Sequence, residues 1–366
     1  MKIYINNEVL INSLTKVIGV IERRQTLPIL SNVFFNLSDG VLKLTGTDLE
    51  VQISSVCNVD TTESIKATLP GRKLIDICRS LEKDSEITMN FKEDKVLLQA
   101  GKSRFTLRVL AADEFPLFDE QQYLSQLSLD KTVLHKAFHK TTFCMAQQDI
   151  RYYLNGLMLE IKQGNIQTVA SDGHRLALFH TDLKNQDISM SQAIIPRKAA
   201  QEILKLLDST ESDIDIKIAK NHINFLIGSV ELNAKLIDGR FPDFKNVIPD
   251  QSPHSFTIDK QAFKAALSRV SILSNEKYRG IRLDLNENLI SISANNPERD
   301  EAEEAVTVDY SGENISMGFN SSYLMEALSA IESDEVCVSF TDTNSSCLLE
   351  DINDSSSQFV IMPMRL

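Results

Sequence analysis

Apolar residues recur at helical spacing in six stretches of the chain, namely residues 10–24, 71–83, 131–142, 197–207, 260–277 and 321–331. This spacing is typical of amphipathic helices. Short segments between them, among them 86–91, 214–219 and 335–340, alternate apolar and polar residues, which indicates strands with one buried face. The pattern predicts an α+β protein whose helices lie on one face of antiparallel sheets.

The order of these elements repeats three times along the chain. Each repeat has a strand, a helix, several strands, a second helix and further short strands, and Asn32, Gly156 and Gly280 take the same place at equal intervals. The repeat predicts three domains over residues 1–125, 126–252 and 253–366. Because no low-complexity linker separates them, we expect the domains to be packed closely.

The stretch ASDGHRLALF, residues 170–179, has the composition of a catalytic loop, since Asp172 and His174 lie two residues apart. The corresponding stretches of the other repeats are GTDLEV and ANNPER, which share no acid and base pair. We therefore expect Asp48 and Asp172 to be turn residues that bond the backbone. A hydrolase that uses Asp172 and His174 remains the alternative, and it requires activity that is lost when either becomes Ala.

Other catalytic or metal motifs are weak. His135 and His139 are spaced four apart, but the sequence offers them no third metal ligand, and it contains no phosphate-binding G-x-x-x-x-G-K-[ST] loop. The five cysteines are scattered and never spaced as C-x-x-C, as in reduced proteins of the cytoplasm. We expect a cytoplasmic protein with no catalytic residue, no metal, no cofactor and no membrane segment.

The distribution of charge favours a polyanionic partner although the chain is acidic. The net charge is -13, yet the first five helical windows are each net basic and only the sixth is net acidic. A fold that presents its helices on one surface would give a positive face within a negative body, which suits phosphate contacts. A scaffold that binds only proteins is the third possibility, and added duplex DNA would leave it unperturbed.

Several blocks in order carry a specific resemblance: TLPILSNVFF, LTGTDLEV, QDIRYYLNG, TVASDGHRLAL, DGRFPDF, ILSNEKYRGIRL and the C-terminal VIMPMRL. Over its whole length the chain resembles the bacterial DNA polymerase III beta subunit family, the sliding clamps. The resemblance implies a ring of two chains and six domains that encircles double-stranded DNA and confers processivity without catalysis. It also implies partners that bind through short linear motifs: the catalytic subunit of DNA polymerase III, the clamp loader, other polymerases and repair proteins.

The resemblance further implies three sets of site residues. The DNA backbone would contact Arg24, Gln148, Arg151, Tyr152 and Tyr153, with a place in the core as the alternative for the two tyrosines. Independently of the resemblance, Arg72, Lys73, Arg197 and Lys198 open the second helices of the first two repeats, where cations oppose the helix dipole, so we expect phosphates near them as well. A groove between domains 2 and 3 would accept partner peptides through Leu154, Ser171, Gly173, His174, Arg175, Leu176, Pro242, Val247, Tyr278, Ser346, Val360, Met362, Pro363, Met364 and Arg365. The dimer interface would pair Lys102, Arg104, Phe105 and Leu107 with Ile272, Leu273, Glu298, Glu301 and Glu304 of a second copy.

One position departs from the family pattern. Asn246 stands where many relatives would carry a basic residue, so the polar edge of the groove and its order of preference among partners are expected to differ from theirs.

Overall fold

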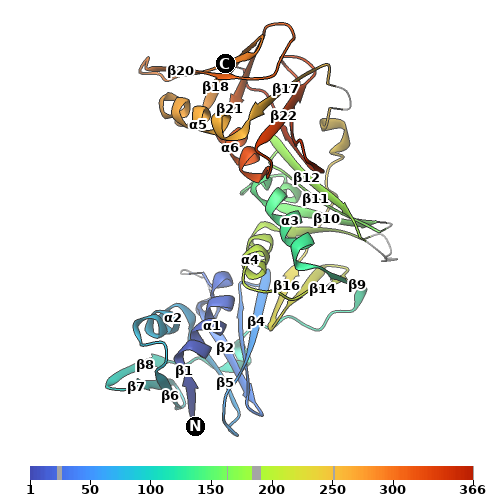
Figure 1. The fold of residues 1–366 in the computed structure, drawn as a ribbon. Helices are drawn as coiled ribbons and strands as arrows, with labels where there is room; N and C mark the ends of the chain where they lie inside the picture. Colours follow the sequence, from blue (N-terminus) through green and yellow to red (C-terminus); the bar gives the residue numbers. More distant parts are fainter. Residues whose placement is uncertain (23–26, 163, 184–190, 250–251, 366) are drawn as a thin grey trace. The chain divides into compact units, whose positions relative to one another are not determined.

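The computed structural model describes residues 1–22, 27–162, 164–183, 191–249 and 252–365. It forms two compact units, one of Met1–His135 with Lys198–Leu236 and one of Lys136–Arg197 with Ile237–Leu366 (Figure 1). Each unit holds an eight-stranded and a four-stranded sheet. All strand pairs are antiparallel, as the alternating pattern predicts.

The eight-stranded sheet of the first unit joins strands of two repeats in the order β5-β2-β3-β4-β16-β15-β14-β9. The first repeat supplies β2 (Asn32–Ser38), β3 (Val41–Thr47), β4 (Val51–Asn58) and β5 (Ile65–Pro70). The second repeat supplies β9 (Tyr123–Leu129), β14 (Ile214–Ala219), β15 (His222–Ile227) and β16 (Val230–Lys235). The four-stranded sheet, in the order β1-β6-β7-β8, consists of β1 (Lys2–Asn6), β6 (Glu86–Phe91), β7 (Lys95–Ala100) and β8 (Ser103–Arg108).

The second unit follows the same scheme. Its eight-stranded sheet, in the order β13-β10-β11-β12-β24-β23-β22-β17, takes from the second repeat β10 (Gly156–Lys162), β11 (Asn165–Ser171), β12 (Arg175–Asp182) and β13 (Ser191–Pro196). The third repeat adds β17 (His254–Asp259), β22 (Glu335–Phe340), β23 (Cys347–Asp351) and β24 (Asp354–Ile361). The four-stranded sheet, in the order β20-β19-β18-β21, consists of β18 (Gly280–Asn286), β19 (Leu289–Asn295), β20 (Glu301–Thr307) and β21 (Ile315–Asn320).

Six α-helices are present in the described residues, two for each repeat: α1 (Asn7–Val17), α2 (Gly71–Ser80), α3 (Lys131–Thr141), α4 (Arg197–Leu207), α5 (Lys260–Val270) and α6 (Ser321–Ala330). The first helix of each repeat is shorter than its apolar pattern predicts and continues as one 3-10 turn: η1 (Ile18–Val20), η4 (Thr142–Cys144) or η7 (Ser271–Leu273). The remaining 3-10 turns are η2 (Pro28–Ser31), η3 (Ala112–Glu114), η5 (Tyr152–Leu154) and η6 (Lys245–Val247). None of the described helices is long and apolar enough to cross a membrane.

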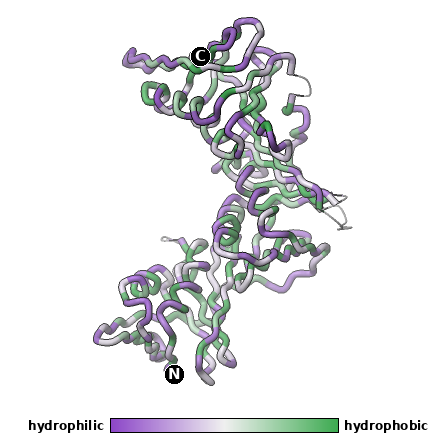
Figure 2. Tube along the Cα trace, viewed as in Figure 1, coloured by the Kyte–Doolittle hydropathy of each residue, from purple (hydrophilic) through white to green (hydrophobic). Residues whose placement is uncertain are grey.

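The register of the repeats is visible in the strands. Asn32, Gly156 and Gly280 open β2, β10 and β18, and their backbones lie opposite Pro70, Pro196 and Asn320 at the start of the second helices. Hydrophobic and hydrophilic residues are interspersed along the chain (Figure 2), and the helical spacing of the apolar residues lets each helix bury one face. In α1, for example, Leu10, Leu14 and Val17 are fully buried, and the helix packs on β3 and β4.

Candidate partner groove and DNA interface

The turn between β11 and β12 is built by side chains that bond its own backbone. The Asp172 carboxylate accepts hydrogen bonds from the backbone N–H groups of His174 and Arg175, both at 3.0 Å. The Ser171 hydroxyl donates to the carbonyl of Arg175 at 2.7 Å and accepts from the N–H of Gly173. Gly173 has a φ of 85°, which glycine adopts without strain.

The first repeat contains the same turn, as the sequence predicts. Asp48 accepts hydrogen bonds from the N–H groups of Glu50 and Val51, and the Thr47 hydroxyl donates to the carbonyl of Val51. The two aspartates therefore shape equivalent turns, and the Asp172 carboxylate has partners that a general base would have to give up.

Arg175, the last residue of this turn, is held in place by buried contacts of its side chain. Its side chain is only 9% exposed and bonds Asp172 at 3.1 Å, Glu326 of α6 at 2.6 Å and the carbonyl of Phe143 at 3.0 Å. The guanidinium also lies over the ring of Tyr323, 4.4 Å from its centroid. Because its charge is paired and its donors are occupied, Arg175 can remain buried at the base of a binding site.

A cavity of about 170 Å³ opens beside the turn. Nine of the residues that the resemblance assigns to the groove line it: Leu154, Ser171, Gly173, Arg175, Leu176, Pro242, Val247, Val360 and Met362. Arg151, Tyr153, Phe241, Asp243 and Phe244 complete the lining. Nine of these fourteen residues are apolar or aromatic, and seven of the nine belong to one buried cluster or pack against it, which suits an apolar side chain of a bound peptide.

The other predicted groove residues lie outside this lining. The exposed His174 accepts a hydrogen bond at its carbonyl from the N–H of Met362, and Ser346 donates to the carbonyl of Val247. The N–H of Met364 donates to the carbonyl of Gly318 in β21, which fastens the C-terminal segment. Pro363 is half-buried and Arg365 and Tyr278 are exposed.

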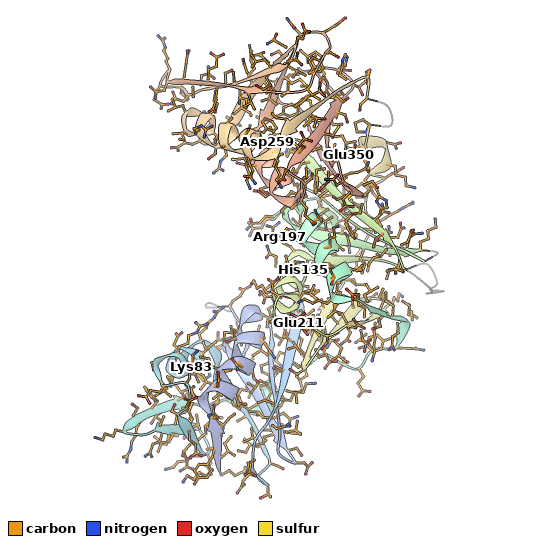
Figure 3. The ribbon with its side chains drawn as sticks, in the orientation of Figure 1. Lys83, His135, Arg197, Glu211, Asp259 and Glu350 are labelled. Atoms are coloured by element: carbon orange, nitrogen blue, oxygen red, sulfur yellow. The ribbon has the colours of Figure 1, made fainter. Side chains whose placement is uncertain are left out.

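Two arginines predicted to contact DNA hold the ends of 3-10 turns. Arg72, in the first turn of α2, donates from two nitrogens to the carbonyl of Ile21, which follows η1. Arg197, at the start of α4 (Figure 3), donates to the carbonyl of Met145, which follows η4. Each arginine therefore holds the residue that directly follows the first helix and 3-10 turn of its repeat.

Some of the remaining residues predicted to contact DNA are paired with carboxylates of the protein, and others are exposed to solvent. Lys198 bonds the carboxylates of Asp48 and Glu22. Burial lowers the pKa of Lys198, but the hydrogen bonds and negative charges of these two carboxylates together outweigh burial and raise it. Lys73, Gln148 and Tyr152 are exposed. Arg151 bonds Asp149, Tyr153 packs at the groove, and Arg24 lies outside the described residues.

The predicted dimer residues lie on or near two sheet edges. On β8, Arg104 is exposed, Phe105 is half-buried and Leu107 is buried, while Lys102 is exposed in the hairpin before it. On β20, Glu301 is exposed and Glu304 pairs with Arg269, and Glu298 is exposed in the turn before it. Ile272 and Leu273 lie in η7, where Ile272 is 76% exposed, so a large apolar side chain faces solvent there.

Three family models of the DNA polymerase III beta subunit match the chain in order. The N-terminal domain matches residues 1–119, the central domain 128–243 and the C-terminal domain 245–365. The beta sliding clamp of Pseudomonas aeruginosa is 44% identical over 367 residues, and that of Escherichia coli K12 is 40% identical, with both chains covered completely. The chain belongs to the DNA polymerase III beta subunit family, the beta sliding clamps.

The fold agrees with this family throughout. A crystal structure of the DNA polymerase III beta subunit from Pseudomonas aeruginosa superposes with a TM-score of 0.95 at 43% identity, and each chain is covered completely. The expectation of an α+β protein with three repeated clamp domains is therefore confirmed. Beta sliding clamps are processivity factors and not enzymes, so the hydrolase alternative built on Asp172 and His174 is excluded.

Residues that the resemblance left out of the groove have signals in the sequence. Phe241, Asp243 and Phe244 belong to the stretch FPDF. The two phenylalanines pack against the buried cluster, which explains two aromatic residues in a loop, whereas Asp243 is exposed at the rim. Arg151 and Tyr153 were expected at the DNA, but both line the cavity.

Proposed function

We propose that two copies of this chain close into a ring around duplex DNA, with domain boundaries near residues 125 and 252. The topology carries the proposal. In the first unit β4 pairs with β16 of the next repeat, and in the second unit β12 pairs with β24 of the next repeat. The equivalent strands that remain are β20, which edges one four-stranded sheet, and β8, which edges the other. Pairing β20 with β8 of a second copy, and the reverse, would repeat the same join twice and close the assembly.

The two joins within the chain also supply a register for this pairing. Leu232 lies opposite Ile53 in the first join, and Phe359 lies opposite Ala177 in the second. The hairpin pairings make Phe105 of β8 equivalent to Leu232 and Phe359, and Ala302 of β20 equivalent to Ile53 and Ala177. The same register would therefore place Phe105 of one copy opposite Ala302 of the other, and Arg104 opposite Glu303. The apolar pair would lie on the covered face and the charged pair on the exposed face, which favours both affinity and correct register.

The DNA would be held by contacts to its phosphates. Lys73 and Gln148 are exposed, and we propose that they reach the backbone together with Arg24, while Tyr152 supplies an exposed ring. Arg72 and Arg197 support the segments that follow the first helices through the contacts described above. Lys198 also supports the first of these segments, since it donates to the carbonyl of Val20. Such contacts carry no sequence information, which a clamp needs in order to slide.

Partner proteins would bind in the groove beside the turn at 171–175. An apolar residue of an extended peptide would enter the cavity between Leu176, Val247 and Val360. A sliding clamp from Pseudomonas aeruginosa has been solved bound to griselimycin, which shows that such a clamp accepts a ligand. We propose that DNA polymerase III, the clamp loader and repair proteins use this groove here.

Retention on a nicked circular plasmid tests the ring. The protein is loaded with a clamp loader, and the plasmid is then cut once. A ring that encloses the duplex remains on the circle and slides off the linear molecule. Equal retention before and after cutting would contradict enclosure and favour direct binding.

A further inference from the structure

Arg151 joins two segments that surround the groove. Its guanidinium donates to both carboxylate oxygens of Asp149, at 3.0 Å and 2.9 Å, and to the backbone carbonyl of Asp172 at 3.2 Å. The first partner lies in the loop before η5, and the second lies in the turn between β11 and β12. A planar guanidinium has donors on two edges, so it can make both contacts at once, which a lysine ammonium cannot reproduce in the same geometry.

The turn is shaped to receive this side chain. A Cβ added to Gly173 would lie 2.6 Å from one guanidinium nitrogen of Arg151 and 2.8 Å from another. A side chain at position 173 would therefore displace Arg151, whatever the strain of its backbone. The absent Cβ and the contact with the Asp172 carbonyl together place Arg151 flat against the turn.

The loop side of the contact is also rigidly held. The Asn155 side chain accepts a hydrogen bond from the N–H of Asp149 and donates to the carbonyl of the same residue, at 2.9 Å and 2.8 Å. The Asp149 carboxylate additionally accepts from the N–H of Arg151. Arg151 therefore connects a braced loop to the turn, and the turn in turn bonds Met362 through the carbonyl of His174.

This arrangement bears on how Arg151 could act at DNA. Its charge faces the Asp149 carboxylate, and the hydrogen bonds from Arg151 lower the pKa of that carboxyl to about 2, so the pair stays ionised near neutral pH. A cation already paired in this way releases few counterions when a phosphate approaches. A phosphate ligand with an unpaired cationic side chain would release more counterions and would give a steeper dependence of affinity on salt.

We propose that Arg151 is a positioning residue of the partner groove and not a phosphate ligand. Its side chain fixes the position of the turn at 171–175 relative to the loop at 148–155. The proposal rests on the proposed groove. Because one side chain holds both segments, a displacement of the loop changes the wall formed by Ser171, Gly173 and Leu176. Peptide affinity therefore depends on Arg151 as well as on the apolar side chains of the loop that line the cavity, Tyr153 and Leu154.

Two variants separate positioning from charge. Arg151→Ala removes all the contacts, and Arg151→Lys keeps the charge but loses the fork. The probe is a short fluorescein-labelled peptide with Leu and Phe as apolar anchors, titrated by fluorescence anisotropy. We expect both variants to bind it about tenfold more weakly than the parent chain, the size of a lost hydrogen bond to a charged group. Lys162→Ala, which removes an exposed cation of β10, should leave peptide binding unchanged.

Duplex binding measured over a range of salt concentrations supplies the second readout. We expect Arg151→Ala to keep the parent slope of log affinity against log salt, whereas loss of a phosphate ligand reduces the slope by about 1. Unchanged peptide affinity in Arg151→Ala, full peptide binding in Arg151→Lys, or a reduced salt slope would each overturn the proposal. If the parent chain itself fails to bind the peptide, the groove assignment fails instead, so the two failures are distinguishable.

Discussion

Arg197 donates a hydrogen bond of 2.5 Å to the backbone carbonyl of Met145. Met145 ends the 3-10 turn that follows α3, and Arg72 makes the same kind of contact to Ile21 after α1. The third repeat has Ser321 and Ser322 at the start of its second helix and no arginine in that turn. The contact is therefore a feature of the first two repeats, and it supports a structural role for cations that composition alone would assign to DNA.

Replacing Arg197 by Ala should destabilise the second unit, because the Met145 carbonyl loses its charged donor in a region that is largely buried. The expected loss is about 1–3 kcal/mol in the free energy of unfolding, measured by urea titration. Lys73→Ala is the matched control, since it removes an exposed cation from the first turn of α2 and should cost less than about 0.5 kcal/mol. Equal losses in the two variants would contradict the structural role.

The repeat and the fold class could be predicted from the sequence, but the sharing of sheets could not. Alternation of apolar and polar residues shows which face of a strand is buried, whereas it does not show which strand lies beside it. β4 pairs with β16, and the two are separated by more than a hundred residues of chain. The sequence therefore predicts three closely packed domains without showing how their sheets are joined, and in the structure each eight-stranded sheet combines two repeats.

The turns of the site could be predicted from local sequence, whereas the contacts that hold the walls of the groove could not. An Asp in a short polar turn between two strands is a local signal, and both Asp48 and Asp172 bond the backbone as predicted. The partners of Arg151 depend on a contact across twenty-one residues, which no local pattern reports. Its residue type fits a phosphate contact equally well, and only the geometry distinguishes the two roles.

The proposed dimer predicts that apolar residues at the open edges carry most of the association energy. Phe105→Ala and Leu273→Ala should each shift the protein to monomers in sedimentation velocity, since each removes apolar area from a proposed interface. Leu289→Ala, which truncates a 40% exposed side chain of β19, is the control and should remain dimeric. A parent chain that is monomeric at all concentrations would refute the pairing of β8 with β20.

The strand register makes a sharper version of this prediction. If Arg104 of one copy lies opposite Glu303 of the other, Arg104→Glu should weaken the dimer, and Glu303→Arg in the same chain should restore much of it. Exchange of Glu301 for Arg should rescue Arg104→Glu less well. Equal rescue at positions 301 and 303 would contradict the register, although it would leave the dimer itself intact.

The DNA contacts should differ in their dependence on salt. Lys73→Ala should weaken duplex binding equally on unrelated sequences and reduce the slope of log affinity against log salt by about 1. Gln148→Ala should weaken binding without changing the slope, because a neutral amide releases no counterion. Filter binding on two duplexes of unrelated sequence provides the measurement. A strong preference for one duplex would contradict contact through phosphates alone.

Acid should remove the stabilising contribution of one ion pair in the second unit, Lys136 with Asp354, only as the pH falls below about 4. Burial raises the pKa of the Asp354 carboxyl, but hydrogen bonds from Lys136 and Ser356 outweigh this and hold it at about 2. Because this value lies below that of an unfolded Asp, about 3.9, the contribution to stability is complete above pH 4 and is lost as the pH falls toward 2. The difference in urea midpoint between the parent chain and Asp354→Asn should therefore shrink over that interval. A difference in urea midpoint that stays constant with pH would exclude the ion pair as its cause. Asp60→Asn, which changes an exposed carboxylate, is the control variant.

The C-terminal segment should matter for peptide binding more than for folding. The N–H of Met364 bonds Gly318 and that of Met362 bonds His174, so removal of residues 364–366 releases one end of the segment that holds Met362 at the cavity. The eight-stranded sheet ends at Ile361 and remains whole. We expect the binding free energy for an apolar-anchored peptide to weaken by about 2 kcal/mol, the usual size of a hot-spot loss.

Titration by fluorescence anisotropy measures this affinity, and sedimentation of the same sample shows whether dimers persist. Ile352→Ala removes an apolar side chain that is 46% exposed in the hairpin before β24 and should have no effect. Undiminished peptide binding after truncation would mean that the segment forms no wall of the groove, and the peptide would then have to be held by the turn at 171–175 and the FPDF loop alone.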